Sequence, residues 1–295
     1  DETTRVLELL KGRADLVVNA VSPAVLPMLR KEPGIRVLTR DGTGYAYMGF
    51  NVRNGPMSDP RVRRAVCHLV DVSPIVEHKF HGLAVPASGM LPKTHWAYAS
   101  TTGCRFDPKE AARLLDEAGY PDPDGPGGQP RFTLSYKTST DRFRKSIALV
   151  FKEQLEKGGI EVDLRALEFG TFFSDVRRGN FEVITLKWAA VVEPDLLRWV
   201  FASEHIPTKE NNFGGLNRGG YANTELDGLL DRASSASRAD RTDLYARAQH
   251  LIDRDLPYAP LWHESAVAVV SKRLQNYVPS AHGFFRPLAE AKEAR

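Results

Sequence analysis

The sequence predicts an α/β fold, in which helices pack on the faces of a sheet, and two observations support it. Residues 131–190 alternate between strand-like and helix-like segments in the order strand, helix, strand, helix, strand, which is typical of α/β layers. Residues 1–52 add a helix, a strand, a second helix and two strands. The chain has 295 residues, of which 42% are hydrophobic and 26% are charged, so it can bury a core as one large domain or two smaller ones.

The elements of the opening segment follow from helical spacing and from β-branched runs. The first helix stops at Gly12, and the second starts at Ser22-Pro23, because Pro is favoured in the first turn of a helix. β-branched and aromatic residues predict the strands. The expected ranges are helix 4–12, strand 14–20, helix 22–34 and two strands, 35–40 and 45–52.

Capping and turn residues divide the next part of the chain. Residues 59–82 are predicted to form two helices, the first capped by Asp59 with Pro60 at its first position. Residues 86–103 are rich in Pro, Gly, Ser and Thr and predict a long ordered loop. Helix 107–120 and an exposed turn at 121–130 follow.

The α/β alternation comes next, and its long helix is amphipathic. We expect Leu149, Phe151 and Leu155 on the buried side of this helix. The predicted ranges are strands 131–138, 160–167 and 181–189 and helices 141–159 and 169–179.

The last third of the chain is mainly helical and ends in an extended segment. A helix follows Pro194 to about Ala202, and a polar Gly- and Asn-rich stretch leads to helix 224–236 and to a helix that starts near Asp240. Residues 258–271 form a strand or a strand pair, and residues 276–291 resemble a tail that needs another surface to pack on.

The charge balance argues against nucleic acid or an anionic membrane as a partner. Lys and Arg number 40 and Asp and Glu 37, which gives a net charge of +3 spread along the chain. The one dense basic stretch, Arg61 to Arg64, is interpreted as a solvated helix face. No apolar run approaches the length that spans a bilayer, so we expect no membrane-spanning segment.

Two cysteines, Cys67 and Cys104, are too few for a disulfide framework, and they have no Cys-x-x-Cys spacing. Cys67 lies in an apolar helical run and is predicted to be a small buried side chain. The sequence leaves open whether the two cysteines form a disulfide, because such a bond requires an oxidising compartment.

The sequence gives little support for catalysis or for a metal. His78 and His81, with Glu77 beside them, have a spacing that two metal ligands can use, but no third ligand is identifiable. Asp163 and Glu168 lack a matched third group for acid–base chemistry. The chain has no phosphate-binding Gly-rich loop and no nucleophile elbow. We therefore predict no enzyme, no catalytic residue, no metal and no cofactor.

Aromatic residues cluster at the ends of predicted elements, where small-molecule sites often lie. Trp199 shares a helix face with Leu196 and Val200 and is assigned to the core. Trp188 lies at the carboxyl end of a strand, where open α/β sheets bind ligands, and is the candidate cleft residue. The full set is Phe169, Phe172, Phe173, Trp188, Trp199, Phe213, Tyr221 and Trp262.

Several blocks, in order, resemble one protein family. They include "YAYMGFNVRNGPMSDPRVRRAVCHLVDVSPIV", "FDPKEAARLLDEAGYPD", "LEKGGIEVDLRALEFGTFFSDVRRGNFEVITLKW", "YANTELDGLLDRA" and "DRTDLYARAQHLIDRDLPYAPLW". The chain is similar, over nearly its whole length, to the peptide-type (dipeptide, oligopeptide and nickel) extracytoplasmic solute-binding proteins of ABC importers.

The resemblance implies a type II-like (cluster C) periplasmic-binding-protein fold, with a mixed sheet flanked by helices. Members have two lobes that close on a ligand and deliver it to a membrane permease. They are exported, and many Gram-positive members carry an N-terminal lipid anchor. Members are longer than this chain, which starts without Met, so we expect a C-terminal portion. Residues 1–47 would belong to the first lobe and hinge, 48–264 to the C-terminal solute-binding lobe, and 265–295 would return to the first lobe.

The resemblance also suggests site residues. In peptide-binding relatives, the tryptophan that matches Trp188 is followed three residues later by an Asp that pairs with the ligand's amino group. Val191 stands at that position here, and the nearest carboxylate is Glu193. Phe169 matches a second pocket aromatic. The predicted ligand contacts are Trp188, Glu193, Phe169, Asn217, Arg218 and Tyr221.

The leading hypothesis is therefore a transport protein that captures a peptide or similar small solute by hinge closure. A sensor or adaptor that presents a ligand on the same scaffold is the alternative. A hydrolase is a third hypothesis, against which the absence of a triad or metal motif argues.

Overall fold

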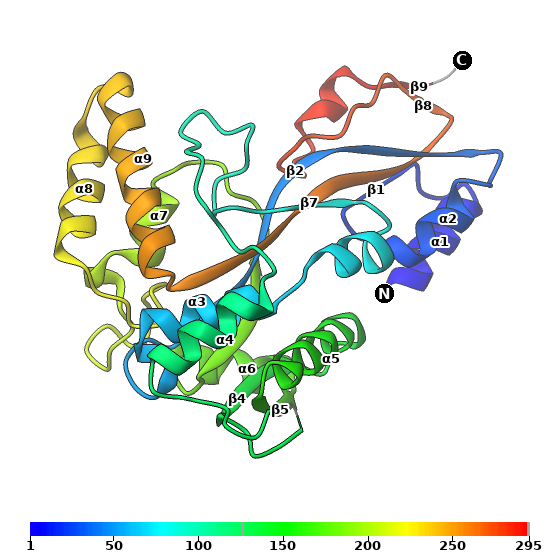
Figure 1. Ribbon diagram of the computed structural model, residues 1–295. Coiled ribbons are helices and arrows are strands. Elements are labelled where there is room, and N and C mark those ends of the chain that lie inside the picture. The colour runs from blue at the N-terminus through cyan, green and yellow to red at the C-terminus, as the bar shows by residue number, and fades with distance from the viewer. Residues whose placement is uncertain (126, 294–295) are drawn as a thin grey trace.

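The computed structural model describes residues 1–125 and 127–293. Within these residues a seven-stranded sheet has the order β1-β7-β2-β6-β4-β5, with β3 paired to β7 (Figure 1). Its strands are β1 (Leu16–Val18), β2 (Ile35–Phe50), β3 (Ala84–Pro86), β4 (Phe132–Ser139), β5 (Ile160–Leu167), β6 (Val183–Trp188) and β7 (Tyr258–Ser271). The sheet is mixed, because β4, β5 and β6 are parallel neighbours and the other pairs are antiparallel.

Two long strands form the spine of the molecule. β2 and β7 pair along nearly their whole length and cross the molecule from the side of α8 and α9 to the side of α1 and α2 (Figure 1). The register shifts between Arg40 and Gly44. At this irregularity a Cβ on Gly42 would lie 2.1 Å from the carbonyl oxygen of Glu264, so only glycine permits this close approach of the two strands.

The predicted strand–helix alternation is confirmed. β4, α5 (Arg142–Lys157), β5, α6 (Phe169–Arg177) and β6 follow one another, and the parallel strands have the spatial order β5-β4-β6. The side chain of Asp141 caps α5 and that of Glu168 caps α6, which fixes where each helix begins. Both helices therefore start at the carboxyl edge of the parallel strands.

One face of the sheet packs on α3 (Pro60–Leu69), α4 (Pro108–Glu117) and α5. Met48 and Phe50 of β2 and Leu134 of β4 contribute to this core with Trp262 of β7. Cys67 is buried here and forms a disulfide with Cys104, with their Cα atoms 5.3 Å apart. The bond ties α3 to the segment that leads into α4.

The opposite face packs on α7 (Leu196–Phe201), α8 (Thr224–Ser235) and α9 (Arg238–Asp255). Tyr45, Tyr47 and Tyr258 present their rings on this face, and Tyr47 and Tyr258 stack with centroids 4.0 Å apart. Strand alternation thus separates the two cores, since Tyr45 and Tyr47 point one way and Ala46 and Met48 point the other.

The two ends of the chain meet beside the far half of β2 and β7. α1 (Glu2–Leu10), α2 (Leu26–Leu29) and β1 share a small core with this half of the sheet. The C-terminal segment returns to the same region, where Tyr277 is buried against Ala268 and Val270. The remaining short elements are η1 (Pro23–Val25), η2 (Pro56–Ser58), η3 (Ile75–Lys79), η4 (Ser203–His205), β8 (Leu274–Gln275), η5 (Arg286–Glu290) and β9 (Lys292–Glu293).

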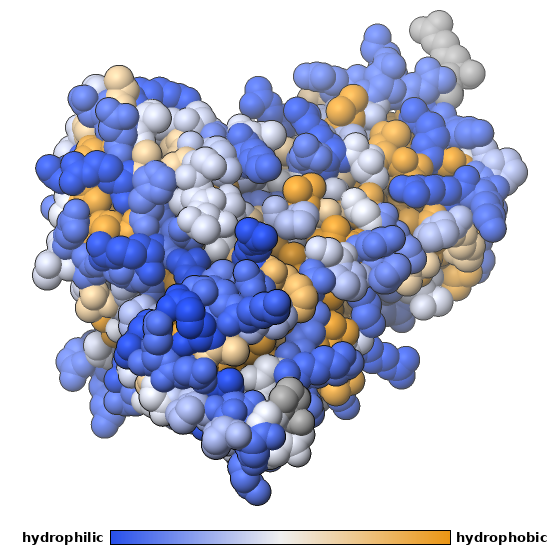
Figure 2. All heavy atoms as spheres, viewed as in Figure 1, coloured by the Kyte–Doolittle hydropathy of each residue, from blue (hydrophilic) through white to orange (hydrophobic). Residues whose placement is uncertain are grey.

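The tail prediction, that residues 276–291 need another surface, is met in part. Tyr277 packs on the sheet, whereas Val278, Phe284 and Phe285 are exposed. Figure 2 shows hydrophobic side chains on the surface around this C-terminal segment.

Several element predictions were wrong. The strands expected at 35–40 and 45–52 are the single strand β2, because β7 pairs with both halves and bridges the irregularity. The second helix expected within 59–82 is one π-helical turn, η3. The helix expected over 22–34 shortens to η1 and α2, since Pro27 and Pro33 limit its hydrogen bonding.

Three side chains also differ from expectation. Trp199 is 53% exposed and stacks on His205, with ring centroids 4.3 Å apart, instead of joining the core. Leu149 faces solvent, while Phe151 and Leu155 are buried as predicted. Arg63, from the stretch interpreted as solvated, is buried and donates to backbone carbonyls.

Candidate functional site

A cleft of about 680 Å³ opens over the middle of the sheet. Its floor is formed by neighbouring parts of β2, β6 and β7, which contribute Ala46, Lys187 and Glu264. Residues 19–23 and 281–284, together with Phe80 and Phe143, line the rest of the cleft. The volume is within the range of ligand pockets for small molecules.

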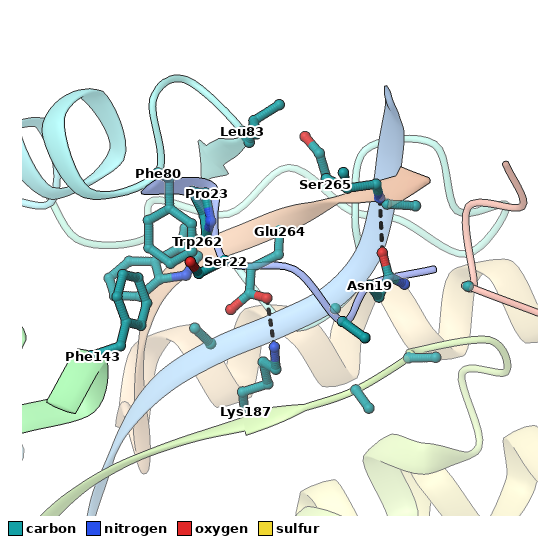
Figure 3. A pocket seen from close by; sticks show the side chains of 18 of the residues that line it. Asn19, Ser22, Pro23, Phe80, Leu83, Phe143, Lys187, Trp262, Glu264 and Ser265 are labelled. Carbon is teal, nitrogen blue, oxygen red and sulfur yellow. Dashed lines mark hydrogen bonds and ion pairs between the residues drawn. The ribbon is translucent and has the colours of Figure 1, made fainter. Parts of the chain in front are cut away.

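The floor carries an ion pair that spans three strands. Lys187 Nζ of β6 lies 2.6 Å from Glu264 Oε2 of β7, and the two side chains point toward each other above β2 (Figure 3). Two residues of β2 lie between them: Gly44 is paired with Glu264 of β7, and Ala46 is paired with Lys187 of β6. Because these two residues are small, the charged side chains can meet and the space above them stays open.

An aromatic wall stands beside this pair. Phe80, Phe143 and Trp262 gather at one side of the cleft (Figure 3). Phe80 meets Phe143 edge to face, with centroids 5.3 Å apart, and Trp262 at 5.2 Å. The indole Nε1 of Trp262 is buried without a hydrogen-bond partner in the described structure. The wall offers apolar surface and one unused donor to a ligand.

The C-terminal segment that lines the cleft is tied to the β2 irregularity. Thr43 donates its amide to Ala281 O at 3.1 Å, and its hydroxyl lies 3.1 Å from His282 Nδ1. Thr43 O accepts the amide of Val191 at 2.9 Å. The exit of β6, the bend of β2 and the C-terminal segment therefore meet at one residue.

None of the six predicted contacts lines this cleft, although Lys187, Ala189 and Ala190 next to Trp188 do. Three of the six form a separate cluster. The guanidinium of Arg218 lies over the ring of Phe173, with Cζ 4.8 Å from the centroid, and over Trp188 at 5.5 Å. Phe169, which is about half exposed, stacks on Phe173 at 5.8 Å. The structure thus brings Phe169, Trp188 and Arg218 together.

The other three predicted residues lie elsewhere. Asn217 is buried, and its amide nitrogen donates to the carbonyls of Phe201, Ala202 and Tyr221, so it organises the loop after α7. Tyr221 donates its hydroxyl to Asp255 at 2.7 Å, on the side of α9. These contacts satisfy both side chains within the protein, and a ligand role for them stays a prediction.

Glu193 and Val191 point in different directions. Glu193 is exposed, whereas Val191 is fully buried in the core of α7, α8 and α9. Neither places a carboxylate in the cleft. Among the described residues the carboxylates that line the cleft are Glu2, Asp141 and Glu264, and the sequence analysis singled out none of them. Nothing in the sequence links Glu264 to the cleft, because its ion-pair partner Lys187 lies 77 residues away in the chain.

Phe80, Phe143, Lys187 and Glu264 were missed, and Trp262 was named only in the set of aromatics at the ends of predicted elements. No motif links these residues, since they come from different parts of the chain. In the described residues no group of three or more His, Cys, Asp or Glu has a geometry for a metal ion. No helix of the described part is long and apolar enough to cross a membrane.

Comparison with known proteins places this chain in a family. Residues 1–204 match the family model described as Bacterial extracellular solute-binding proteins, family 5 Middle. Heme-binding protein A of Haemophilus influenzae is 27% identical over 289 residues, which are 96% of this chain and 51% of that protein. Probable di/tripeptide-binding protein 5 of Pseudomonas aeruginosa is 26% identical over 293 residues, 96% of this chain and 52% of that protein.

Solved structures agree. The periplasmic binding protein from Helicobacter pylori in complex with the peptide STSA has a TM-score of 0.84 at 24% identity and covers all of this chain and 56% of its own. The oligopeptide-binding protein from Thermus thermophilus complexed with a pentapeptide has a TM-score of 0.81 at 26% identity, over 96% of this chain and 53% of its own.

The chain spans about half the length of the curated relatives it matches. The predicted mixed-sheet, type II-like fold is confirmed by these structures. The match over residues 1–204 shows that the chain belongs to the bacterial extracellular solute-binding proteins, family 5.

Proposed function

We propose that this chain is the C-terminal part of the solute-binding component of an ABC importer, which captures a peptide or similar small solute and delivers it to a membrane permease. The observation that carries this proposal is the open cleft over β2, β6 and β7, which combines an aromatic wall with a charged floor. Relatives named for binding heme or di- and tripeptides support a small organic solute.

Capture works by hinge closure. Residues 48–264 form the solute-binding lobe, and residues 1–47 and 265–295 belong to the first lobe and hinge. The register irregularity of β2 at Arg40–Gly44 supports this, because bulges are places where long strands bend. The ligand stabilises the closed form by binding it more tightly than the open form.

The protein acts outside the cytoplasm, with a lipid anchor in the N-terminal part, and it is not an enzyme. The Cys67–Cys104 disulfide supports this location, because such bonds persist in oxidising compartments. Its relatives in the family are solute-binding proteins.

The test uses the full-length protein that contains this chain. Native mass spectrometry of protein purified from its own host identifies a co-purified solute, and calorimetry measures its affinity. Small-angle scattering then records the radius of gyration with and without this solute. We expect a bound solute and a smaller radius in its presence.

Phe143→Ala, in the cleft wall, should weaken the affinity for this solute. Leu149→Ala is the matched control, since Leu149 lies on the exposed side of the same helix. The proposal fails if no solute is found and if neither di-, tri- nor pentapeptides bind or change the radius.

A further inference from the structure

Two arginines at one edge of the sheet hold donors that the protein does not use. Arg218 is only 9% exposed, yet its Nε is buried without a hydrogen-bond partner. Arg144 is half-buried, and its Nη1 is likewise buried without a hydrogen-bond partner. Within the described residues, neither guanidinium forms an ion pair with a carboxylate. A buried cation without a counter-charge costs free energy, so an acceptor that is missing here is expected.

The aromatic rings around these arginines hold them in a fixed arrangement. Arg144 Cζ lies 5.5 Å from the ring of Phe169, Phe169 stacks on Phe173, and Arg218 lies between Phe173 and Trp188. We call these five residues the arginine–aromatic cluster. The unpartnered Nε of Arg218, with a neighbouring Nη–H, suits a planar, bidentate acceptor. Trp188 adds a third unused donor, because its indole Nε1 is also buried without a partner.

Topology places this cluster where ligands bind in α/β sheets. Arg144 lies in the first turn of α5 after β4, Phe169 and Phe173 lie on α6 after β5, and Trp188 ends β6. The first two positions follow the carboxyl ends of β4 and β5, and Trp188 is the last residue of β6, so all three lie at the carboxyl edge of the parallel strands. Arg144 also lines the cleft, so the cluster adjoins it.

The carboxylates that precede α5 and α6 form no ion pair with Arg144 or Arg218 in the described residues. Asp141 and Glu168 accept backbone N–H groups as the caps of α5 and α6. The phenol of Tyr47 neighbours Arg218, but burial raises the pKa of Tyr47 despite the opposing effect of Arg218, so it stays neutral. The cluster therefore presents two positive charges and an indole donor to one region.

We propose that the arginine–aromatic cluster binds a carboxylate group of the captured solute, with Arg218 and Trp188 as its donors and Arg144 as the second cation. This proposal rests on the proposed function, and it narrows the solute to molecules that bear a carboxylate. An apolar group next to the carboxylate packs on Phe169 and Phe173. Arg218 and Trp188 were predicted contacts, and this assigns them a chemistry.

The experiment uses the full-length protein and two probes of equal shape, benzoate and benzamide, titrated to about 100 mM because a lone carboxylate contact gives millimolar affinity. At constant ionic strength, we expect benzoate to raise the thermal midpoint and to bind in calorimetry, while benzamide does neither. Arg218→Met should weaken benzoate binding about tenfold or more, as expected for a lost hydrogen bond to a charged group.

Three further variants keep the test decisive. Trp188→Phe retains an aromatic ring and removes the indole N–H. Arg218→Lys retains the positive charge and removes the pair of parallel guanidinium N–H donors. Both should weaken benzoate binding, and both are informative if Arg218→Met does not fold. Arg178→Met is the control, because Arg178 also lies over an aromatic ring, that of Phe213 at 5.7 Å, but outside the cluster. It should bind benzoate as the wild type does.

Three results with the benzoate and benzamide probes would each overturn the proposal. These are equal effects of benzoate and benzamide, unchanged benzoate binding in both Arg218→Lys and Trp188→Phe, and no benzoate binding at all. A full-length protein that captures a solute without a carboxylate also overturns it but leaves the proposed function standing. A protein that captures no solute and does not close contradicts the proposed function itself.

Discussion

Lys187 Nζ and Glu264 Oε2 are 2.6 Å apart, although the two residues lie on strands that are separated by β2. The pair is accessible, with side chains that are 42% and 25% exposed. Ion pairs of this kind contribute about 1 kcal/mol or less to stability, because water screens them. We therefore interpret the pair as a feature of the cleft floor more than as a support of the fold.

A double-mutant cycle tests this interpretation. Lys187→Met, Glu264→Gln and the double variant should show a coupling free energy of unfolding of about 0.5 kcal/mol in urea. Affinity for the co-purified solute should change more than stability does. A coupling of about 3 kcal/mol would instead identify the pair as a buried structural contact.

The Cys67–Cys104 disulfide should stabilise the lobe. The two cysteines are 37 residues apart, and a loop of this length corresponds to a loss of unfolded-state entropy of about 4 kcal/mol. A reductant, or Cys67→Ala with Cys104→Ala, should therefore lower the urea midpoint. Thiol titration under denaturing conditions should detect no free thiol before reduction. Two free thiols in protein exported by its own host would show that the bond does not form.

Two half-buried histidines should make the protein sensitive to mild acid. Burial lowers the pKa of His263, whose Nε2 lies 3.2 Å from Gly89 O, and of His95, whose Nε2 lies 3.1 Å from Val192 O. The unfolded chain then takes up protons first as pH falls below about 6.5, so the free energy of unfolding is constant above this pH and decreases below it.

Unfolding in urea at several pH values between about 7.5 and 5 measures this effect. His263→Gln should flatten the pH dependence while leaving a donor for Gly89 O. His78→Gln is the matched control, because His78 is exposed on η3, and it should follow the wild type. If His263→Gln and His95→Gln both kept the wild-type pH dependence, the half-buried imidazoles would not be its source.

The sequence predicted best the elements that have strong local signals. β5 was predicted with its observed ends, and α5 and α6 within about two residues, because each has caps and a clear hydrophobic period. Trp199 shows the limit of this reasoning. α7 has only six residues, too few for a periodic face to identify its buried side, and Trp199 instead stacks on His205 of the following turn.

The site could be predicted only where its residues follow one another in the chain. Phe169 and Trp188 lie at ends of consecutive elements, so topology alone brings them to one edge. The cleft floor depends on which strand lies between β6 and β7, and nothing local specifies that β2 does so. The pairing of Lys187 with Glu264 could therefore be identified only from the structure.

Arg63 joins the start of α3 to the turn between α9 and β7. It is buried, and its guanidinium donates to four backbone carbonyls, those of Met57, Ser58, Asp255 and Leu256. The turn it supports is unusual, because Leu256 has a left-handed conformation with φ of 47°. Burial lowers the pKa of Arg63 to about 10, so it remains charged at neutral pH.

Arg63→Met should lower the free energy of unfolding by about 3 kcal/mol, since it leaves buried carbonyls without donors. Arg61→Met is the matched control on the same helix, where Arg61 is exposed, and it should change stability little. Urea unfolding of both variants measures the difference. Equal, small effects would mean that water replaces the guanidinium at these carbonyls and that the turn at Leu256 holds without it.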